Sequence, residues 1–481
     1  MMRRQAIATT IVLALLAFEF LVLAILAFFP YVPDPGLATL NMSIYTFLAP
    51  LSTVFLLGLL YAWLVRFGTR EIRRRSSSFN DFVRFLSEPF QKTVSSIKTT
   101  TLSESARSFK LLSYPRLMLG ISLIVSVLIV FVPYRPDLNP AATLVGIDSP
   151  TYVGWISQML GLPLLNALQY SFVQGLDGSR PLLLVLFYLV GSAGVSPSQI
   201  IEYTPMLLAP LLSLSAYTFV RYGNGSARFA GLTALFSSVS FYSTVGLWGG
   251  YYANWLGLIL VYLFLTCLLI FSRSPSAMKY STMYILSVAL FLTHPYTWVM
   301  IVVVSLVFSF SLWRETSNLV HVKSVIAIIT TGIVLDIVKS WAFATQSVTA
   351  QWPSSAANGA GSLLVFWNNL VEALLYTHGG LLGNWLMLGL GLVAVFTLRS
   401  KDWFERLLLL WVGVASMPFP ALGSYLEARI LYDLPIPVLT SIAVVSLLPQ
   451  IGARNIRWPG FVLLLLIVVS TSYALQSVLL L

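Results

Sequence analysis

The chain has 481 residues, of which 58% are hydrophobic and 9% are charged, and it contains a single cysteine. A soluble domain cannot bury so much apolar surface, and one cysteine excludes both an intramolecular disulfide and a cysteine-based metal site. The net charge of +11 could indicate a nucleic-acid partner. The basic residues, however, gather between apolar runs, a distribution typical of the cytoplasmic side of a membrane protein.

Apolar runs of about 20 residues, the length that a bilayer requires, recur along the chain. They predict an all-α polytopic membrane protein with about 13 transmembrane helices, its N-terminus in the cytoplasm and its C-terminus outside. Residues 1–66 are expected to form two additional N-terminal transmembrane helices. The first is interpreted as a retained span, since its apolar run is longer than that of a signal peptide and no small-residue cleavage site follows.

Residues 67–113 form a basic segment that is predicted to be cytoplasmic. The stretch from Arg66 to Arg116 contains eleven Lys and Arg residues. Apolar side chains at helical spacing within it, from Phe79 to Phe90, favour an amphipathic helix on an anionic inner leaflet. A solvated basic linker is an equally good interpretation.

Residues 114–481 are predicted to form the main transmembrane core, with its first span at about 117–134 and outer loops at about 135–199 and 342–380. Within the first loop, residues 181–195 are apolar but number only about 15, which is short for a span. If they crossed the membrane, Arg221 and Arg228 would lie outside, against the usual charge bias. We therefore expect an interfacial or re-entrant helix on the outer side, followed by an inward span at 200–220.

The spans expected after that are 229–245, 251–271, 280–293, 296–313, 320–341, 381–398, 403–417, 430–448 and 459–480. This topology places 24 of the 28 Lys and Arg residues on the cytoplasmic side. The four at or near the outer face are Arg135, Arg180, Lys339 and Arg429. Such asymmetry supports the orientation.

Asp148 is the candidate catalytic residue. It lies between Gly146 and the pair Ser149-Pro150, in a polar stretch from 133 to 161 that is neither a span nor basic. Transfer of a sugar from a phospholipid carrier needs a carboxylate to take the proton from the acceptor hydroxyl. The alternative is a helix cap, because Asp-Ser-Pro is a good helix start.

The outer cations are candidate anion ligands, because guanidinium groups bind phosphate through two parallel hydrogen bonds. Arg429 is the best placed, at the expected membrane edge; the alternatives are an ion pair with Glu427 or Asp433, or anchoring at headgroups. Arg135 and Arg180 bracket the first loop and either bind substrate or cap helices. Lys339, three residues after Asp336, is expected to form an intrahelical ion pair.

His294 precedes a proline at the mouth between two spans, where it could bind a phosphate oxygen or a sugar hydroxyl. It could instead satisfy backbone groups freed by the proline. Tyr152 and Tyr252 are further candidates for substrate binding, although aromatic residues also gather at membrane interfaces for other reasons. The expected outer loops contain no HExxH, cysteine cluster or paired DxD, so no protein-made metal site is predicted.

From residue 114 onward the pattern resembles the GT-C superfamily of polyprenyl-phosphate-sugar-dependent membrane glycosyltransferases. The resemblance is architectural, and it rests on GIDSPTYVGW, SRPLLLVLFYLVGSAGVSP, VRYGNGSARFAGLTALF and ARILYDLPIP. It implies that Asp148 is the catalytic carboxylate and Arg429 a lipid-phosphate ligand; His294 has a looser match. The absence of a WWD-type motif disfavours en bloc glycan transfer to asparagine.

The expected function is an inverting glycosyltransferase, without a cofactor, that moves a sugar from a polyprenyl-phosphate donor to a protein, glycan or lipid acceptor on the extracytoplasmic face of the cell membrane. Its other partners would be membrane lipids, and nucleic acid is not expected. A transporter or flippase for a lipid-linked or anionic solute is the main alternative. A third possibility is a non-catalytic membrane scaffold that docks a partner through the basic segment.

Overall fold

The computed structural model describes residues 114–173, 178–343, 384–395, 398, 402–416, 431–452 and 458–479. The two N-terminal spans, the basic segment, nearly all of the second expected outer loop, and Arg429 lie outside the described residues. Within the described part of the chain, every regular element is a helix.

The first helices bring the chain to the Asp148 loop and return it to the bundle. Their bounds are α5 Pro115–Phe131, η3 Val132–Tyr134, α6 Ser149–Leu160, α7 Leu164–Val173, α9 Pro181–Ser192, α10 Pro197–Gly223, α11 Ala227–Ser238 and α12 Phe241–Gly249. The remaining helices are α13 Tyr252–Arg273, α14 Ala277–Thr293, α15 Pro295–Thr316, α16 Val320–Phe343, α19 Trp385–Val395, α20 Trp403–Ala415, α22 Ile436–Gly452 and α23 Trp458–Val478.

Six helical segments of the described chain are long and apolar enough to cross a membrane. They are Pro115–Tyr134, Pro197–Gly223, Ala227–Gly249, Tyr252–Arg273, Pro295–Thr316 and Val320–Phe343. The expected all-α character is therefore confirmed for the described residues, and their six long apolar helices indicate a multi-pass membrane protein. The expected number of about 13 spans remains a prediction, because several of them fall on shorter helices or outside the described residues.

The span expected at 229–245 is made of two helices, α11 and α12, which sequence periodicity did not separate. The break falls at Val239 and Ser240, where the Ser240 hydroxyl accepts a hydrogen bond from the Tyr242 backbone and starts the new helix. The apolar part of Ala227–Gly249 is buried on all sides. Neighbouring helices thus surround this segment, and it forms the centre of the bundle.

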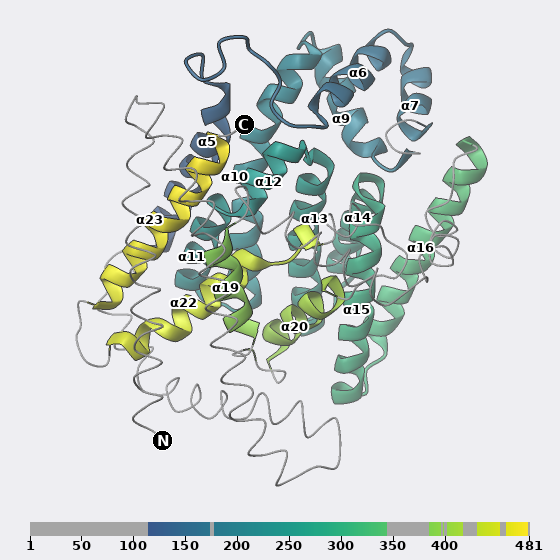
Figure 1. Cartoon of the computed structure of the whole chain (residues 1–481). Helices are drawn as coiled ribbons and strands as arrows, with labels where there is room; N and C mark the ends of the chain where they lie inside the picture. Colours follow the sequence, from purple (N-terminus) through teal and green to yellow (C-terminus); the bar gives the residue numbers. More distant parts are fainter. Residues whose placement is uncertain are drawn as a thin grey trace, which may run out of the picture.

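Three short helices, α6, α7 and α9, form a layer across one end of the bundle (Figure 1). The apolar segment that we expected not to span is α9, which has only 12 residues and packs against α6 and α7. At 1.5 Å per residue it is about 18 Å long, well below the roughly 30 Å of a bilayer core. We call this end of the molecule the α6 end.

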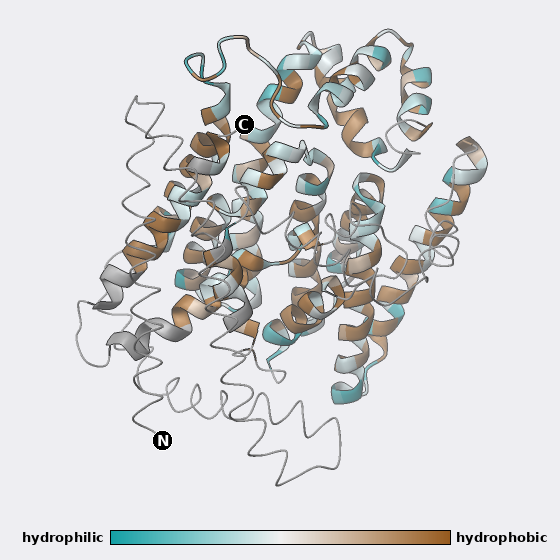
Figure 2. Ribbon diagram, viewed as in Figure 1, coloured by the Kyte–Doolittle hydropathy of each residue, from teal (hydrophilic) through white to brown (hydrophobic). Residues whose placement is uncertain are grey.

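The spans run alternately toward and away from the α6 end, so residues distant in sequence meet there (Figure 1). The end of α12 and the starts of α13 and α15 lie on this side. Hydrophobic residues cover much of the helix bodies, whereas hydrophilic residues concentrate at helix ends and in the loop after η3 (Figure 2). A band of this kind is expected of helices that face lipid.

Candidate functional site at the Asp148 loop

The Asp148 loop is fixed to the junction between α12 and α13 by backbone hydrogen bonds. The amide of Ile147 donates to the carbonyl of Trp248 at 2.9 Å, and the amide of Asp148 donates to that of Gly249 at 3.2 Å. Gly250 has a left-handed backbone with φ of +66°, and a Cβ there would lie 3.2 Å from the Cβ of Asp148. The glycine pair therefore lets two loops approach closely enough to hold Asp148 in place.

Asp148 occupies the position that precedes α6, but its carboxylate makes no capping hydrogen bond to the helix. Its backbone carbonyl instead accepts from the amide of Tyr152 at 3.1 Å, while Pro150 occupies the first turn. The helix-cap interpretation of this carboxylate is therefore not supported. The side chain is 25% exposed, which leaves it accessible at the boundary between bundle and solvent.

Arg180 is the described cation beside Asp148. Its Nη1 lies 3.8 Å from the Asp148 Oδ2, longer than a charge-assisted hydrogen bond but close enough for the charges to interact. The same nitrogen donates to the Tyr152 hydroxyl at 2.5 Å. Only 3% of the Arg180 side chain is exposed, and its Nε has no hydrogen-bond partner among the described residues. Arg180 makes no side-chain capping hydrogen bond to α9, so the helix-cap interpretation does not account for its guanidinium.

Tyr152 and Tyr252, both candidates from the sequence, meet under the loop with ring centroids 5.4 Å apart. The Tyr252 hydroxyl hydrogen-bonds to the hydroxyl of Ser149 at 2.7 Å. Both tyrosines are fully buried. They join α6 to α13 and support the adjacent residues Asp148 and Arg180.

Arg135 lies in the loop before Asp148, where it forms an exposed ion pair with Asp137. A pair of this kind contributes little to stability because water screens it. Arg135 thus pairs with Asp137, two residues away. Of the two arginines at the ends of the first loop, Arg180 is the one that lies near Asp148.

The expected ion pair between Asp336 and Lys339 in α16 is confirmed, with 3.9 Å between Oδ1 and Nζ. Lys339 also donates to the backbone carbonyl of Gly178 at 3.2 Å. Close by, the rings of Phe172 and Phe343 stack with centroids 4.8 Å apart. The end of α16 thereby holds the segment that leads into Arg180.

His294 lies between α14 and α15 on the α6 side of the bundle and is only 4% exposed. Its Nδ1 lies 2.7 Å from the Thr297 hydroxyl, which in turn donates to the carboxylate of Asp433. The interpretation that His294 serves the helix start after the proline is partly supported, since its side chain also accepts from the Thr297 amide at 3.3 Å. The hydrogen bond from Thr297 to Asp433 is not required for that role and connects the start of α15 to a distant part of the chain.

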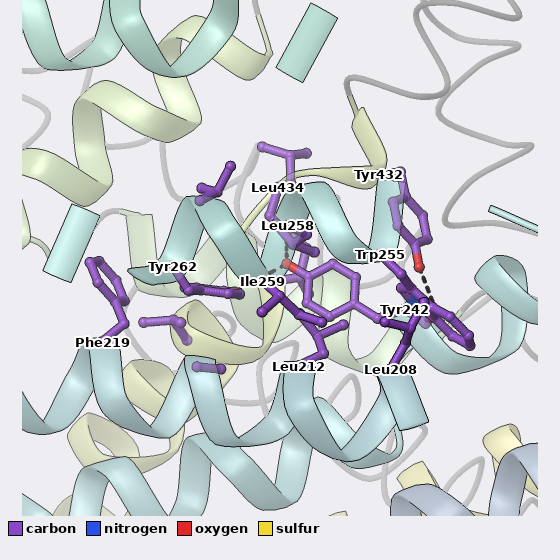
Figure 3. Close-up of a cluster of buried hydrophobic side chains, with 14 of the residues drawn as sticks. Leu208, Leu212, Phe219, Tyr242, Trp255, Leu258, Ile259, Tyr262, Tyr432 and Leu434 are labelled. Carbon is purple, nitrogen blue, oxygen red and sulfur yellow. Dashed lines mark hydrogen bonds between the residues drawn. The ribbon is translucent and has the colours of Figure 1, made fainter. Parts of the chain in front are cut away.

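The segment that follows Arg429 in sequence is fixed beside the Asp148 loop by an aromatic cluster, which is shown in Figure 3. The hydroxyl of Tyr432 donates to the backbone carbonyl of Tyr242 at 2.5 Å, and the hydroxyl of Tyr242 donates to that of Leu434 at 2.5 Å. The rings of Tyr432 and Tyr251 lie 5.6 Å apart, edge to face. Because Tyr251 follows the glycine pair that holds Asp148, the two segments share one support.

Sequence reasoning singled out neither Ser149 nor Thr297 nor Tyr432 as a site residue. Hydroxyl residues are common, so one that follows a carboxylate, or that lies three residues after a histidine, does not by itself indicate a site. Asp433 had a signal, its place in ARILYDLPIP, but only as a possible partner of Arg429. Groups of three or more His, Cys, Asp or Glu residues suited to a metal ion do not occur in the described ranges.

No family model matches the chain, and no curated protein does so.

Proposed function

We propose that the protein is a membrane glycosyltransferase that uses a polyprenyl-phosphate-linked sugar as its donor. The observation that carries the proposal is the Asp148 carboxylate, which is partly exposed, does not cap its helix and lies 3.8 Å from a buried guanidinium. A carboxylate and a cation held together at the end of an apolar bundle suit a substrate with a lipid tail, a phosphate and a sugar.

In the proposed reaction Asp148 accepts the proton of the acceptor hydroxyl as its oxygen bonds to the anomeric carbon. The bond from that carbon to the phosphate oxygen breaks, and polyprenyl phosphate leaves with the bonding electron pair. Attack from the face opposite the leaving group inverts the anomeric configuration. Arg180 and Arg429 would offset the negative charge that develops on the phosphate.

Arg429 lies outside the described residues. It precedes Leu431 by two residues in the sequence. Leu431 and Tyr432 are buried against the cluster that also supports the Asp148 loop. A role for Arg429 as a phosphate ligand is consistent with its place in the sequence just before this cluster.

The alternative, a transporter or flippase, would use charges near the middle of the membrane. In α16, Asp336 and Lys339 are buried, but they precede the last residue of the helix by only seven and four positions. At 1.5 Å per residue this is about 10 Å and 6 Å from the helix end. Their place near the α6 layer favours a structural role over transport.

The test uses purified full-length protein in liposomes that contain a polyprenyl-phosphate donor with a radiolabelled sugar. An enzyme converts label to an acceptor-linked product and releases polyprenyl phosphate, whereas a flippase moves intact donor between leaflets. A range of sugars and an extract of endogenous acceptors is required. Movement of donor without chemical conversion would reject the proposal in favour of transport.

A further inference from the structure

A cavity lies between the last turns of α15 and the first turn of α20, two helices that pack against each other. We call it the α15 cavity. Its volume is about 610 Å³, which is large enough for a small ligand. Two arginines and a glutamate line it together with apolar and hydroxyl side chains: Val307, Phe310, Ser311, Arg314, Glu315 and Arg406. This end of α15 points away from the α6 end, so the cavity is separate from the Asp148 loop (Figure 1).

The α15 residues of the cavity form one strip along the helix. Phe310 follows Val307 by three residues and precedes Arg314 by four, and residues at this spacing share a face. Helix α15 ends at Thr316, nine residues after Val307 and two after Arg314. At 1.5 Å per residue these positions are about 14 Å and 3 Å from the helix end. The strip therefore changes from apolar to cationic toward the end of the span.

The surroundings of the strip are those of a membrane surface. Val307 and Phe310 are 43% and 42% exposed, as expected of side chains that face lipid tails. Trp313 lies beside Arg314 and is also exposed, and tryptophan gathers at the level of lipid headgroups. The apolar part of the strip thus suits an acyl chain, and the arginines suit a headgroup.

The charges of the cavity favour a particular kind of headgroup. The Arg406 side chain is only 12% exposed; it forms an ion pair with Glu315 at 2.5 Å and donates to the Ser311 hydroxyl at 3.3 Å. Arg314 is exposed and has no ion-pair partner among the described residues. One positive charge therefore remains after Arg406 and Glu315 balance each other. It matches a headgroup with one net negative charge.

We propose that the α15 cavity binds an anionic phospholipid of the cytoplasmic leaflet. Arg314 donates to the phosphodiester, Arg406 adds positive charge from the neighbouring helix, and an acyl chain lies along Phe310 and Val307. The predicted topology puts both arginines on the cytoplasmic side, where basic pockets between transmembrane helices bind anionic headgroups. Such a lipid joins the end of α15 to the start of α20. The proposal does not depend on sugar transfer.

The test measures binding of phosphatidylglycerol and phosphatidylcholine to the purified full-length protein in detergent by native mass spectrometry. We expect phosphatidylglycerol to bind about tenfold more tightly. Arg314→Gln changes an exposed residue and should weaken phosphatidylglycerol binding about tenfold, the effect of one lost hydrogen bond to a charged group. Arg221→Gln is the matched control, because Arg221 is exposed on the same predicted side and lies outside the cavity. It should change neither affinity.

Glu315→Gln provides a variant with the opposite expected effect. The amide oxygen still accepts a hydrogen bond from Arg406, but the negative charge is lost. Phosphatidylglycerol should then bind about twofold more tightly, as expected for one unit charge roughly 8 Å from the phosphate in water. High salt should reduce this gain.

Equal affinity for the two lipids would overturn the proposal, and so would an Arg314→Gln variant that binds phosphatidylglycerol as tightly as Arg221→Gln does. Inorganic phosphate, added as a competitor, distinguishes a lipid from a free anion. We expect it to displace phosphatidylglycerol only at a large excess, because it has no acyl chain to contact Val307 and Phe310. Displacement at an equal concentration would show that the cavity takes a free anion, which contradicts a lipid site.

Discussion

Arg180 has two polar partners and almost no contact with solvent. One nitrogen donates to Tyr152, and the guanidinium lies beside Asp148, with its carbon 5.5 Å from the centroid of the Tyr152 ring. The planar fork of arginine matches this geometry, whereas the single ammonium of lysine does not. The side chain can therefore both position Asp148 and present its remaining donors to an anion.

Arg180→Lys should retain the charge but lose the fork. We expect a loss of about 1.5–3 kcal/mol in donor binding or stability, the value of a hydrogen bond to a charged group. Donor KM and the thermal unfolding midpoint in detergent measure the two contributions. Arg135→Lys is the matched control, because Arg135 is exposed and paired with Asp137, and it should change neither quantity; an equal loss in both variants would contradict the role of Arg180.

Gly146 is the residue that allows the Asp148 loop to reach α12. Its φ is +102°, and a Cβ would lie 2.6 Å from the carbonyl oxygen of Leu247. Gly146→Ala should therefore destabilise the loop by more than the roughly 1–3 kcal/mol of backbone strain and reduce transfer. Gly194→Ala isolates the strain, since Gly194 has φ of +97° and no neighbour within 4 Å of a Cβ. Equal unfolding midpoints for the two variants would show that the contact with Leu247 has no effect.

The sequence predicts the helix boundaries that neighbouring residues determine. The Pro197–Gly223 helix begins with a Ser196 and Gln199 capping box and a proline in its first turn, signals that any sequence reading can use. The 12-residue length of α9 follows from a short apolar run that ends near Gly191. The division of one expected span into α11 and α12 was not predicted, because a serine inside an apolar run does not by itself break a helix.

Helix α16 supplies a buried charge pair that supports the α6 end. Lys339→Met would leave the fully buried Asp336 without this cation and remove the hydrogen bond to Gly178. Breaking one side of a buried pair costs about 3–5 kcal/mol, so we expect a clear drop in the unfolding midpoint in detergent. Adding Asp336→Asn should recover part of it by removing the buried charge. A midpoint unchanged by Lys339→Met would show that the pair contributes nothing.

For the molecule as a whole, the sequence indicated the class of protein and made Asp148 a candidate site residue, but it did not reveal the contacts of that residue. Composition and apolar periodicity predict a helical membrane protein, and Asp148 was singled out by its polar surroundings. Asp148 and Arg180, which lie in contact, are 32 positions apart, and His294 and Asp433, which are linked through Thr297, are 139 positions apart. Such pairings arise from tertiary packing, which a single sequence does not reveal.

The predicted orientation can be tested by thiol labelling after Cys267, the single native cysteine, is replaced by serine. A cysteine is then introduced by Ala141→Cys or by Ala277→Cys. Ala141 lies in the exposed loop before Asp148, and Ala277 lies at the exposed start of α14, at the other end of the bundle (Figure 1). A membrane-impermeant maleimide should label position 141 in intact cells and position 277 only after permeabilisation. Labelling of both from the same side would contradict the topology.

If Asp148 is the base in sugar transfer, Asp148→Asn removes the group that takes the acceptor proton. The amide has the same shape but does not accept the acceptor proton, so we expect transfer of radiolabelled sugar to fall by at least about a hundredfold. Expression, the unfolding midpoint and binding of the polyprenyl-phosphate donor should remain close to those of the unaltered protein. Transfer that persists at the original rate in folded Asp148→Asn protein would show that Asp148 is not the base.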